Sequence, residues 1–73
     1  MIASEPLITV DPEILGGTPV FRGTRVPVRT LFEYLADGLT LDYFLESFPS
    51  VERAQAIAVL RYGQARVEQA AAA

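Results

Sequence analysis

The sequence predicts a mainly α-helical fold, in which a short N-terminal β-ribbon precedes a three-helix bundle that contains a helix-turn-helix. A short apolar, β-branched run followed by a glycine-rich segment predicts the ribbon. Beyond residue 27, apolar residues recur at i, i+3, i+4 and i+7, which is the period of an amphipathic helix. Only Pro49 and Ser50 separate the last two periodic segments, so we expect these two helices to cross steeply.

Residues 7–26 are predicted to form the β-ribbon and a constrained loop. The first strand is Leu7–Val10, which Asp11-Pro12 ends, and its predicted partner is 20–22. The connection between the strands has room for one helical turn at 12–15. Glycine reaches backbone angles that are costly for other residues and proline fixes its own φ, so a loop rich in both is held in one shape. The predicted structural loop residues are Gly16, Gly17, Pro19, Gly23 and Thr24.

The first two helices are predicted over residues 27–37 and 41–48. Gly38 stands directly after the first periodic segment, which is the usual place for a glycine that ends a helix. Thr40 is a good N-cap for the second helix, and Pro49 ends it.

The third and longest helix is predicted over residues 51–69, with Ser50 as its cap. Good helix formers follow Gly63, so we expect the helix to continue through this glycine. Residues 1–6 are predicted to be an N-terminal tail, and the alanines at 70–73 are predicted to fray. The residues between these ends, 7–69, are predicted to form a single domain.

Composition excludes several classes of protein. The 73 residues contain no cysteine and no histidine, so neither a disulfide nor the usual zinc ligand sets can stabilise the domain. Most general bases and nucleophiles are also missing, and we predict no catalytic residue, no metal and no cofactor. No apolar run is long enough to cross a membrane, and we expect a cytoplasmic location. A net charge of -3 argues against indiscriminate nucleic-acid binding.

Three arginines stand in a segment that has no other charges. Arg22, Arg25 and Arg29 are the only ionised residues between positions 13 and 33, so one edge of an acidic protein is predicted to be basic. Two interpretations of Arg25 are open, a nucleic-acid contact or an anchor that pairs with Asp11 or Glu13, and the anchor is favoured. Arg22 and Arg29 are expected to be exposed.

The start of the third helix carries residues suited to reading DNA. In a helix-turn-helix the second helix enters the major groove, where Arg pairs with guanine and Gln with adenine. The candidate DNA-binding residues are therefore Ser50, Arg53 and Gln55. The alternative is that these side chains only solvate an exposed helix face, and the acids on the preceding helix would repel phosphate.

The aromatic residues divide into two groups. Phe32, Phe44 and Phe48 follow the apolar stripes and are predicted to be core. The other group falls partly off the stripes and contains candidates for a partner interface, where tyrosine is enriched. Its members are Tyr34, Tyr43 and Tyr62.

The pattern Gly-Gly-x-Pro-x-x-x-Gly-Thr-Arg-Val-Pro-Val over residues 16–28, together with Leu-Ala-Asp-Gly at 35–38 and Phe-Pro-Ser at 48–50, resembles the DUF433 family (domain of unknown function 433). The resemblance covers about residues 7–62. It implies a homeodomain-like or winged-helix-like fold, often dimeric, and an antitoxin of the VapB type that neighbours a PIN-like ribonuclease toxin.

The leading functional hypothesis is thus a non-enzymatic antitoxin of a type II toxin-antitoxin system. It forms a homodimer and inhibits a PIN-like ribonuclease, with an arginine from the basic edge inserted among the carboxylates that hold Mg²⁺. Binding to operator DNA, and so autoregulation, is an additional hypothesis. A stand-alone helix-turn-helix transcriptional regulator and a non-enzymatic oligomerisation module are the alternatives.

Overall fold

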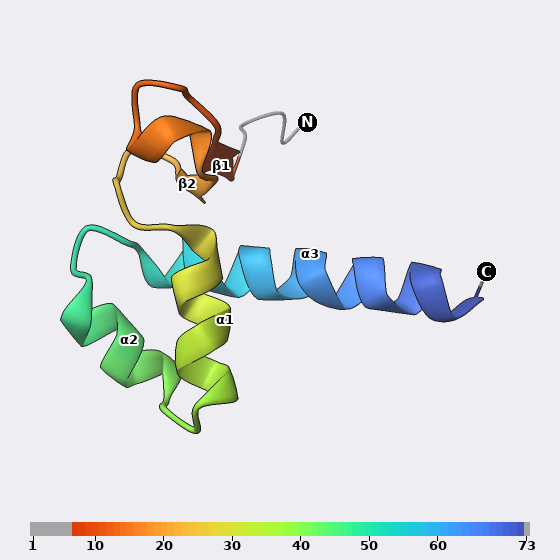
Figure 1. The fold of residues 1–73 in the computed structure, drawn as a ribbon. Helices are drawn as coiled ribbons and strands as arrows, with labels where there is room; N and C mark the ends of the chain where they lie inside the picture. Colours follow the sequence, from red (N-terminus) through yellow and green to blue (C-terminus); the bar gives the residue numbers. More distant parts are fainter. Residues whose placement is uncertain (1–6, 73) are drawn as a thin grey trace.

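The computed structural model describes residues 7–72, so the predicted tail at 1–6 lies outside the described residues. Three helices and a small two-stranded antiparallel sheet make up the fold, which confirms the mainly helical class (Figure 1). In chain order the elements are β1 (Ile8–Thr9), the 3-10 helix η1 (Leu15–Gly17), β2 (Val20–Phe21), α1 (Val28–Ala36), α2 (Leu41–Ser47) and α3 (Arg53–Ala72).

The β-ribbon is short and is anchored by its second strand. β1 pairs antiparallel with β2, with Ile8 opposite Phe21 and Thr9 opposite Val20. Both residues of β2 are fully buried, so the ribbon is attached to the helices through apolar side chains. A two-stranded ribbon of this size is not stable alone, which makes this attachment necessary.

The connection between the strands differs from the expected helical turn at 12–15. A hydrogen-bonded turn covers 11–14, and η1 follows at Leu15–Gly17. Both Gly16 and Gly17 have positive φ values, 65° and 94°, which L side chains rarely adopt. Leu15 also adopts a positive φ, 50°, so the left-handed turn begins on a non-glycine residue and continues through the two glycines, three residues later than the sequence indicated.

The loop between β2 and α1 is closed by its own hydrogen bonds. The N–H of Phe21 donates to the carbonyl of Val26 at 3.0 Å. Inside this closure the Thr24 hydroxyl donates to the Phe21 carbonyl at 2.9 Å and accepts from the Val26 N–H at 3.0 Å. The Val28 N–H donates to the Pro19 carbonyl at 3.0 Å, which joins the loop to the start of α1. The backbone around Gly23 is thus fixed on both sides.

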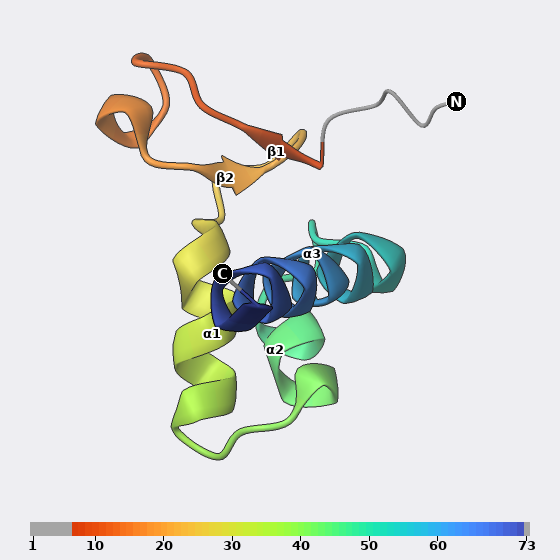
Figure 2. The same cartoon turned by 90° about the vertical axis from the view of Figure 1, so that its right-hand side faces the viewer.

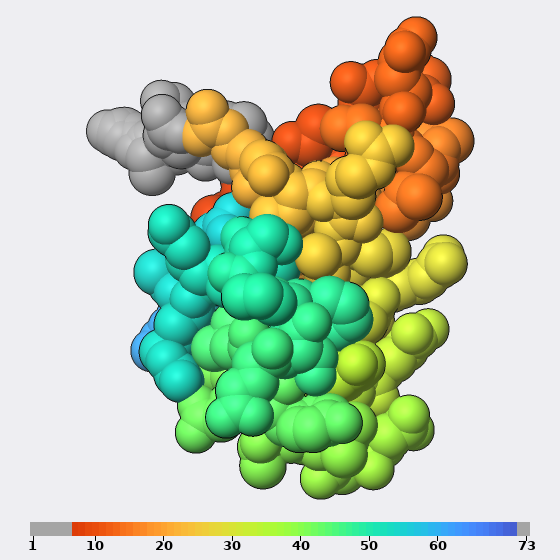
Figure 3. Space-filling view, turned by 90° about the vertical axis from the view of Figure 1, so that its left-hand side faces the viewer, coloured from red at the N-terminus to blue at the C-terminus, as the bar shows by residue number. Residues whose placement is uncertain are grey.

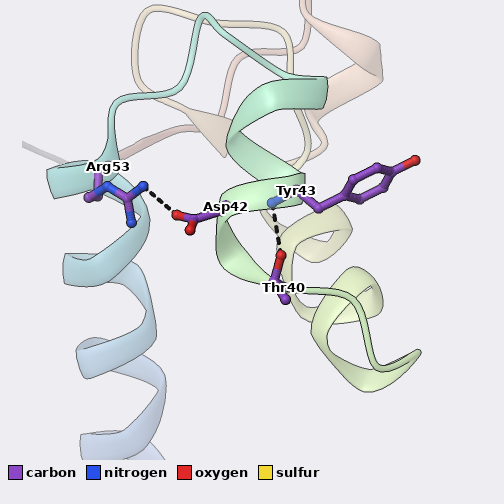
Figure 4. A network of polar contacts seen from close by, with 4 residues as sticks. All are labelled: Thr40, Asp42, Tyr43 and Arg53. Atoms are coloured by element: carbon purple, nitrogen blue, oxygen red, sulfur yellow. Dashed lines mark hydrogen bonds and ion pairs between the residues drawn. The ribbon is translucent and has the colours of Figure 1, made fainter.

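α1 and α2 each end within one residue of the predicted bounds. Gly38 follows the C-cap of α1 with φ +86°, and its N–H donates to the Leu35 carbonyl while the Leu39 N–H donates to the Tyr34 carbonyl. These two bonds form a Schellman motif, which requires the left-handed conformation that glycine adopts easily. At the start of α2 the Thr40 Oγ1 accepts from the Tyr43 N–H at 3.0 Å, so Thr40 is the N-cap (Figure 4).

α3 begins at Arg53, two residues later than predicted, and Ser50 does not cap it. Glu52 stands at the cap position: its carbonyl accepts from the Ala56 N–H at 3.1 Å, and its N–H donates to the Gln55 Oε1 at 3.1 Å. The Gln55 contact is one half of a capping box. At the other end the helix continues to Ala72, so the expected fraying from residue 70 is not seen in the described residues.

The core lies where α1, α2 and the first half of α3 meet below the ribbon. α3 crosses the other two helices steeply, and its second half extends away from the rest of the molecule (Figures 1 and 2). Figure 3 shows the side opposite to that of Figure 2, where α2 and the start of α3 pack closely under the ribbon. The buried cluster consists of Phe21, Val26, Leu31, Phe44, Val51, Ala56 and Val59.

Candidate partner-binding surfaces

The basic edge predicted from the sequence is exposed. The side chains of Arg22, Arg25 and Arg29 all lie at the surface. The preferred interpretation of Arg25 as an anchor is wrong: within residues 7–72 it forms no ion pair with Asp11 or Glu13. The loop is held instead by the backbone and Thr24 hydrogen bonds described above, so the guanidinium of Arg25 is not needed for its closure.

The candidate DNA-reading residues lie together at the start of α3, but two of them are engaged within the chain. Arg53 pairs with Asp42 of α2, and both side chains are more than half exposed (Figure 4). Gln55 uses both ends of its amide, because Oε1 accepts from the Glu52 N–H and Nε2 donates to the Arg22 carbonyl at 3.0 Å. Ser50 is exposed in the turn before α3. These contacts position the start of α3 and its link to the ribbon.

The three tyrosines have different surroundings. Tyr34 is half-buried, and its ring makes edge contacts with the rings of Phe44 and Phe48, with centroids 5.5 and 5.6 Å apart. Tyr43 stacks on Tyr34 at 6.0 Å but remains 51% exposed. Tyr62 is 62% exposed on α3. Tyr43 and Tyr62 are therefore accessible to a partner, whereas much of Tyr34 belongs to the aromatic core.

An apolar groove lies between the ribbon, α1 and α3. Its volume is about 460 Å³, and it is lined by Leu7, Ile8, Val28, Phe32, Val59, Tyr62 and Gly63. Phe32 was expected in the core, yet it is 41% exposed on this groove. A hollow of about 290 Å³ adjoins the groove and shares Val28 and Phe32 with it. Arg29 also lines this hollow, so a cation stands beside the groove.

Gly63 allows the groove to form. A Cβ built at this position would lie 3.3 Å from the ring of Phe32, which shows how closely α3 approaches α1 here. As expected, the helix continues through this glycine. Beyond it, every side chain of residues 64–71 is exposed, and Val67 is 68% exposed. We call residues 64–72 the projecting segment, because they extend beyond the body of the protein (Figure 1).

Sequence reasoning did not find the groove, because its residues come from three separate segments of the chain. Among the groove residues, the sequence identified Tyr62 as an interface candidate. The remaining signal in the sequence was the apolar run of the first predicted strand, whose Leu7 and Ile8 line the groove. Within residues 7–72, no group of acids could hold a metal ion and no helix is long and apolar enough to cross a membrane.

Comparison with known proteins shows that most of this sequence matches one protein family. Residues 8–63 match a family described as "Protein of unknown function (DUF433)". The uncharacterized protein y4eO of Sinorhizobium fredii is 44% identical over 52 residues, which is 71% of this chain. The chain spans only 24% of the length of that relative.

A solved structure shares the fold. The crystal structure of a DUF433 member protein from Anabaena variabilis is similar with a TM-score of 0.72 at 29% sequence identity. The similarity covers 89% of this chain and 64% of that one.

Proposed function

Because this chain belongs to the DUF433 family, whose function is unknown, we propose a function from its own surfaces: it is a non-catalytic antitoxin that binds and inhibits a PIN-like ribonuclease. The observation that carries the proposal is the exposed Arg25 on a loop whose backbone is fixed by hydrogen bonds. The resemblance described from the sequence supports the choice of a ribonuclease toxin as the partner.

The fixed loop suits Arg25 to insertion into another protein. Its two neighbours are held in place, since Thr24 bonds within the loop and Val26 is buried in the core. Little backbone entropy is then lost when the arginine enters a partner's cleft. The guanidinium is free to form a bidentate pair, because it forms no ion pair within residues 7–72.

The partner chemistry that such an arginine fits is a cluster of carboxylates. Ribonucleases that use Mg²⁺ hold the ion with carboxylate oxygens, and a planar guanidinium satisfies two of these oxygens at once. Insertion of Arg25 would neutralise the carboxylates and block the metal and the RNA from the cleft. Inhibition by this route needs no chemistry from the antitoxin, which agrees with a sequence that has no His, Cys or Lys.

DNA reading through α3 receives less support from the contacts. Arg53 would have to leave Asp42, and Gln55 would have to give up its bonds to the Glu52 N–H and the Arg22 carbonyl. Each of these bonds would have to be replaced by a contact with a base before any affinity was gained. Repression of the operon therefore stays a secondary hypothesis, supported by the steep crossing of α3 over α2.

The test is inhibition of a PIN-like ribonuclease, which the proposal expects to be encoded beside this gene. With purified proteins we expect Arg25→Ala to weaken the complex by about 30-fold or more, since loss of one partner of a buried charged pair costs ~2 kcal/mol or more. Arg25→Lys keeps the charge but loses the bidentate geometry, so it should fall between the wild type and Arg25→Ala. Arg61→Ala, which removes an exposed arginine from α3, is the matched control and should leave binding unchanged.

Two results would contradict the proposal. One is a wild-type protein that neither co-purifies with the neighbouring ribonuclease nor slows RNA cleavage. The other is an Arg25→Ala variant that inhibits as well as the wild type, which would remove the basic edge from the mechanism.

A further inference from the structure

We infer that the apolar groove binds an extended segment of a partner protein, in which large apolar side chains stand between acidic residues, and that this segment adds a strand to the outer edge of β1. The inference goes beyond the proposed function, because the groove is a second surface that Arg25 does not line. It rests on the unpaired edge of β1, on the apolar lining of the groove and on the arginines at its rim.

The outer edge of β1 has no backbone partner within residues 7–72. The Arg22 N–H donates to the Leu7 carbonyl at 3.1 Å, so these two residues form a hydrogen-bonded pair of the ribbon. The next pair, Ile8 and Phe21, is then a non-hydrogen-bonded pair, whose backbone groups point away from the partner strand. Phe21 accordingly donates to the Val26 carbonyl on its far side. The N–H and carbonyl of Ile8 point to the opposite side, where the described chain offers them no hydrogen bond.

The groove runs along this edge. Successive strand residues point to opposite faces of a sheet, yet Leu7 and Ile8 both line the groove. The groove therefore follows the edge of the ribbon rather than one of its faces, and β1 lies above α3 in Figures 1 and 2. A strand added at Ile8 would lie between β1 and α3 and would direct alternate side chains toward Phe32 and Tyr62.

The open shape of the groove favours a polypeptide over a small molecule. Ile8, Phe32 and Tyr62 all line it and are 38%, 41% and 62% exposed. Sites for small molecules enclose most of the ligand and hold it with several placed polar groups. Among the side chains that line this groove, only that of Tyr62 has a polar group. Affinity must therefore come from apolar burial and from the backbone of β1.

The arginines at the rim favour an acidic partner. Arg29 is exposed and lines the adjoining hollow beside Phe32. Arg66 is also exposed, and it stands four residues after Tyr62 and three after Gly63, so it lies on the groove side of α3, one turn beyond the groove. No acidic residue of the described chain lines the groove or the hollow. Carboxylates at the ends of a bound segment would each meet a guanidinium, whereas a basic segment would be repelled.

A library of short random peptides tests the chemistry of the occupant. Phage that display the peptides are selected on the immobilised full chain, and the selected sequences should share large apolar residues at alternate positions and acids near the ends. The consensus peptide, labelled with fluorescein, is then the probe for fluorescence anisotropy. A basic or uncharged consensus would overturn the inference. So would a lack of enrichment, which is the result if a second copy or the chain's own first residues fill the groove.

Charge reversals locate the binding site on the protein. Arg66→Glu should raise the Kd of the consensus peptide roughly 5- to 25-fold, because an exposed ion pair is worth up to about 5-fold and the new repulsion about as much again. Arg29→Glu should act in the same way. Arg61→Glu is the matched control, since it makes the same change on the side of α3 that faces away from the groove, and it should leave the Kd unchanged. Circular dichroism establishes that each variant is folded. Equal Kd values for Arg66→Glu and Arg61→Glu would overturn the inference.

N-methylation of the peptide backbone tests the added strand. The peptide residue opposite Ile8 would exchange two hydrogen bonds with it, and the N–H groups of the residues on either side would point away. A scan with one N-methyl group at a time should therefore find one position where the Kd rises roughly 5-fold or more, between two positions that tolerate the change. Equal tolerance at every position would show that the peptide does not pair with β1, and this part of the inference would be wrong.

Discussion

Phe44 is the residue whose loss should show most clearly how the helices are held together. Its side chain is 0% exposed, and its ring lies 6.0 Å from Phe21, 5.5 Å from Tyr34 and 5.1 Å from Phe48 between centroids. It therefore joins the ribbon, α1 and the end of α2. Truncation of a buried phenylalanine to alanine costs about 3–5 kcal/mol. A domain of this length has ~4–11 kcal/mol of stability, so Phe44→Ala should remove a large part of it.

The measurement is chemical and thermal unfolding followed by circular dichroism, with all variants at the same protein concentration so that their stabilities are comparable. We expect Phe44→Ala to lower Tm by more than ~12 °C. The matched control is the preceding residue of α2, since Tyr43 is also aromatic but is 51% exposed. Tyr43→Ala loses one stacking contact and should cost about 1 kcal/mol. Equal losses for the two variants would refute the assignment of Phe44 to the centre of the core.

Two further substitutions test the start and the middle of α3. Gln55→Ala removes both the capping contact to Glu52 and the bond to the Arg22 carbonyl. Denaturant unfolding should therefore show a free energy of unfolding lower by ~1–2 kcal/mol. An unchanged unfolding midpoint would contradict the structural role of this side chain. Gly63→Ala should leave the free energy of unfolding nearly unchanged, because two effects oppose each other. Alanine gains ~1 kcal/mol in helix propensity, but its Cβ would lie 3.3 Å from the ring of Phe32, which is half-exposed and can shift away. A loss of stability above ~2 kcal/mol would show that this ring cannot move.

Features that depend on near neighbours in the chain were predictable from the sequence. Thr40 caps α2 and Gly38 ends α1, and both depend on hydrogen bonds that reach only a few residues along the backbone. The family could be predicted for the same reason, since the pattern at 16–28 is local. The expected exposure of Arg22 and Arg29 was also confirmed.

The tertiary structure decided which apolar faces are covered. Phe32 follows the same helical period as the buried Leu31, but it faces a part of α3 that has a glycine, and it is left at the edge of a groove. Gln55 has the type of side chain that pairs with bases in the major groove. Only the approach of the ribbon gives it the Arg22 carbonyl as a hydrogen-bond partner. The physical reason is that periodicity states which side of a helix is apolar, whereas burial depends on which other segment of the chain reaches that side.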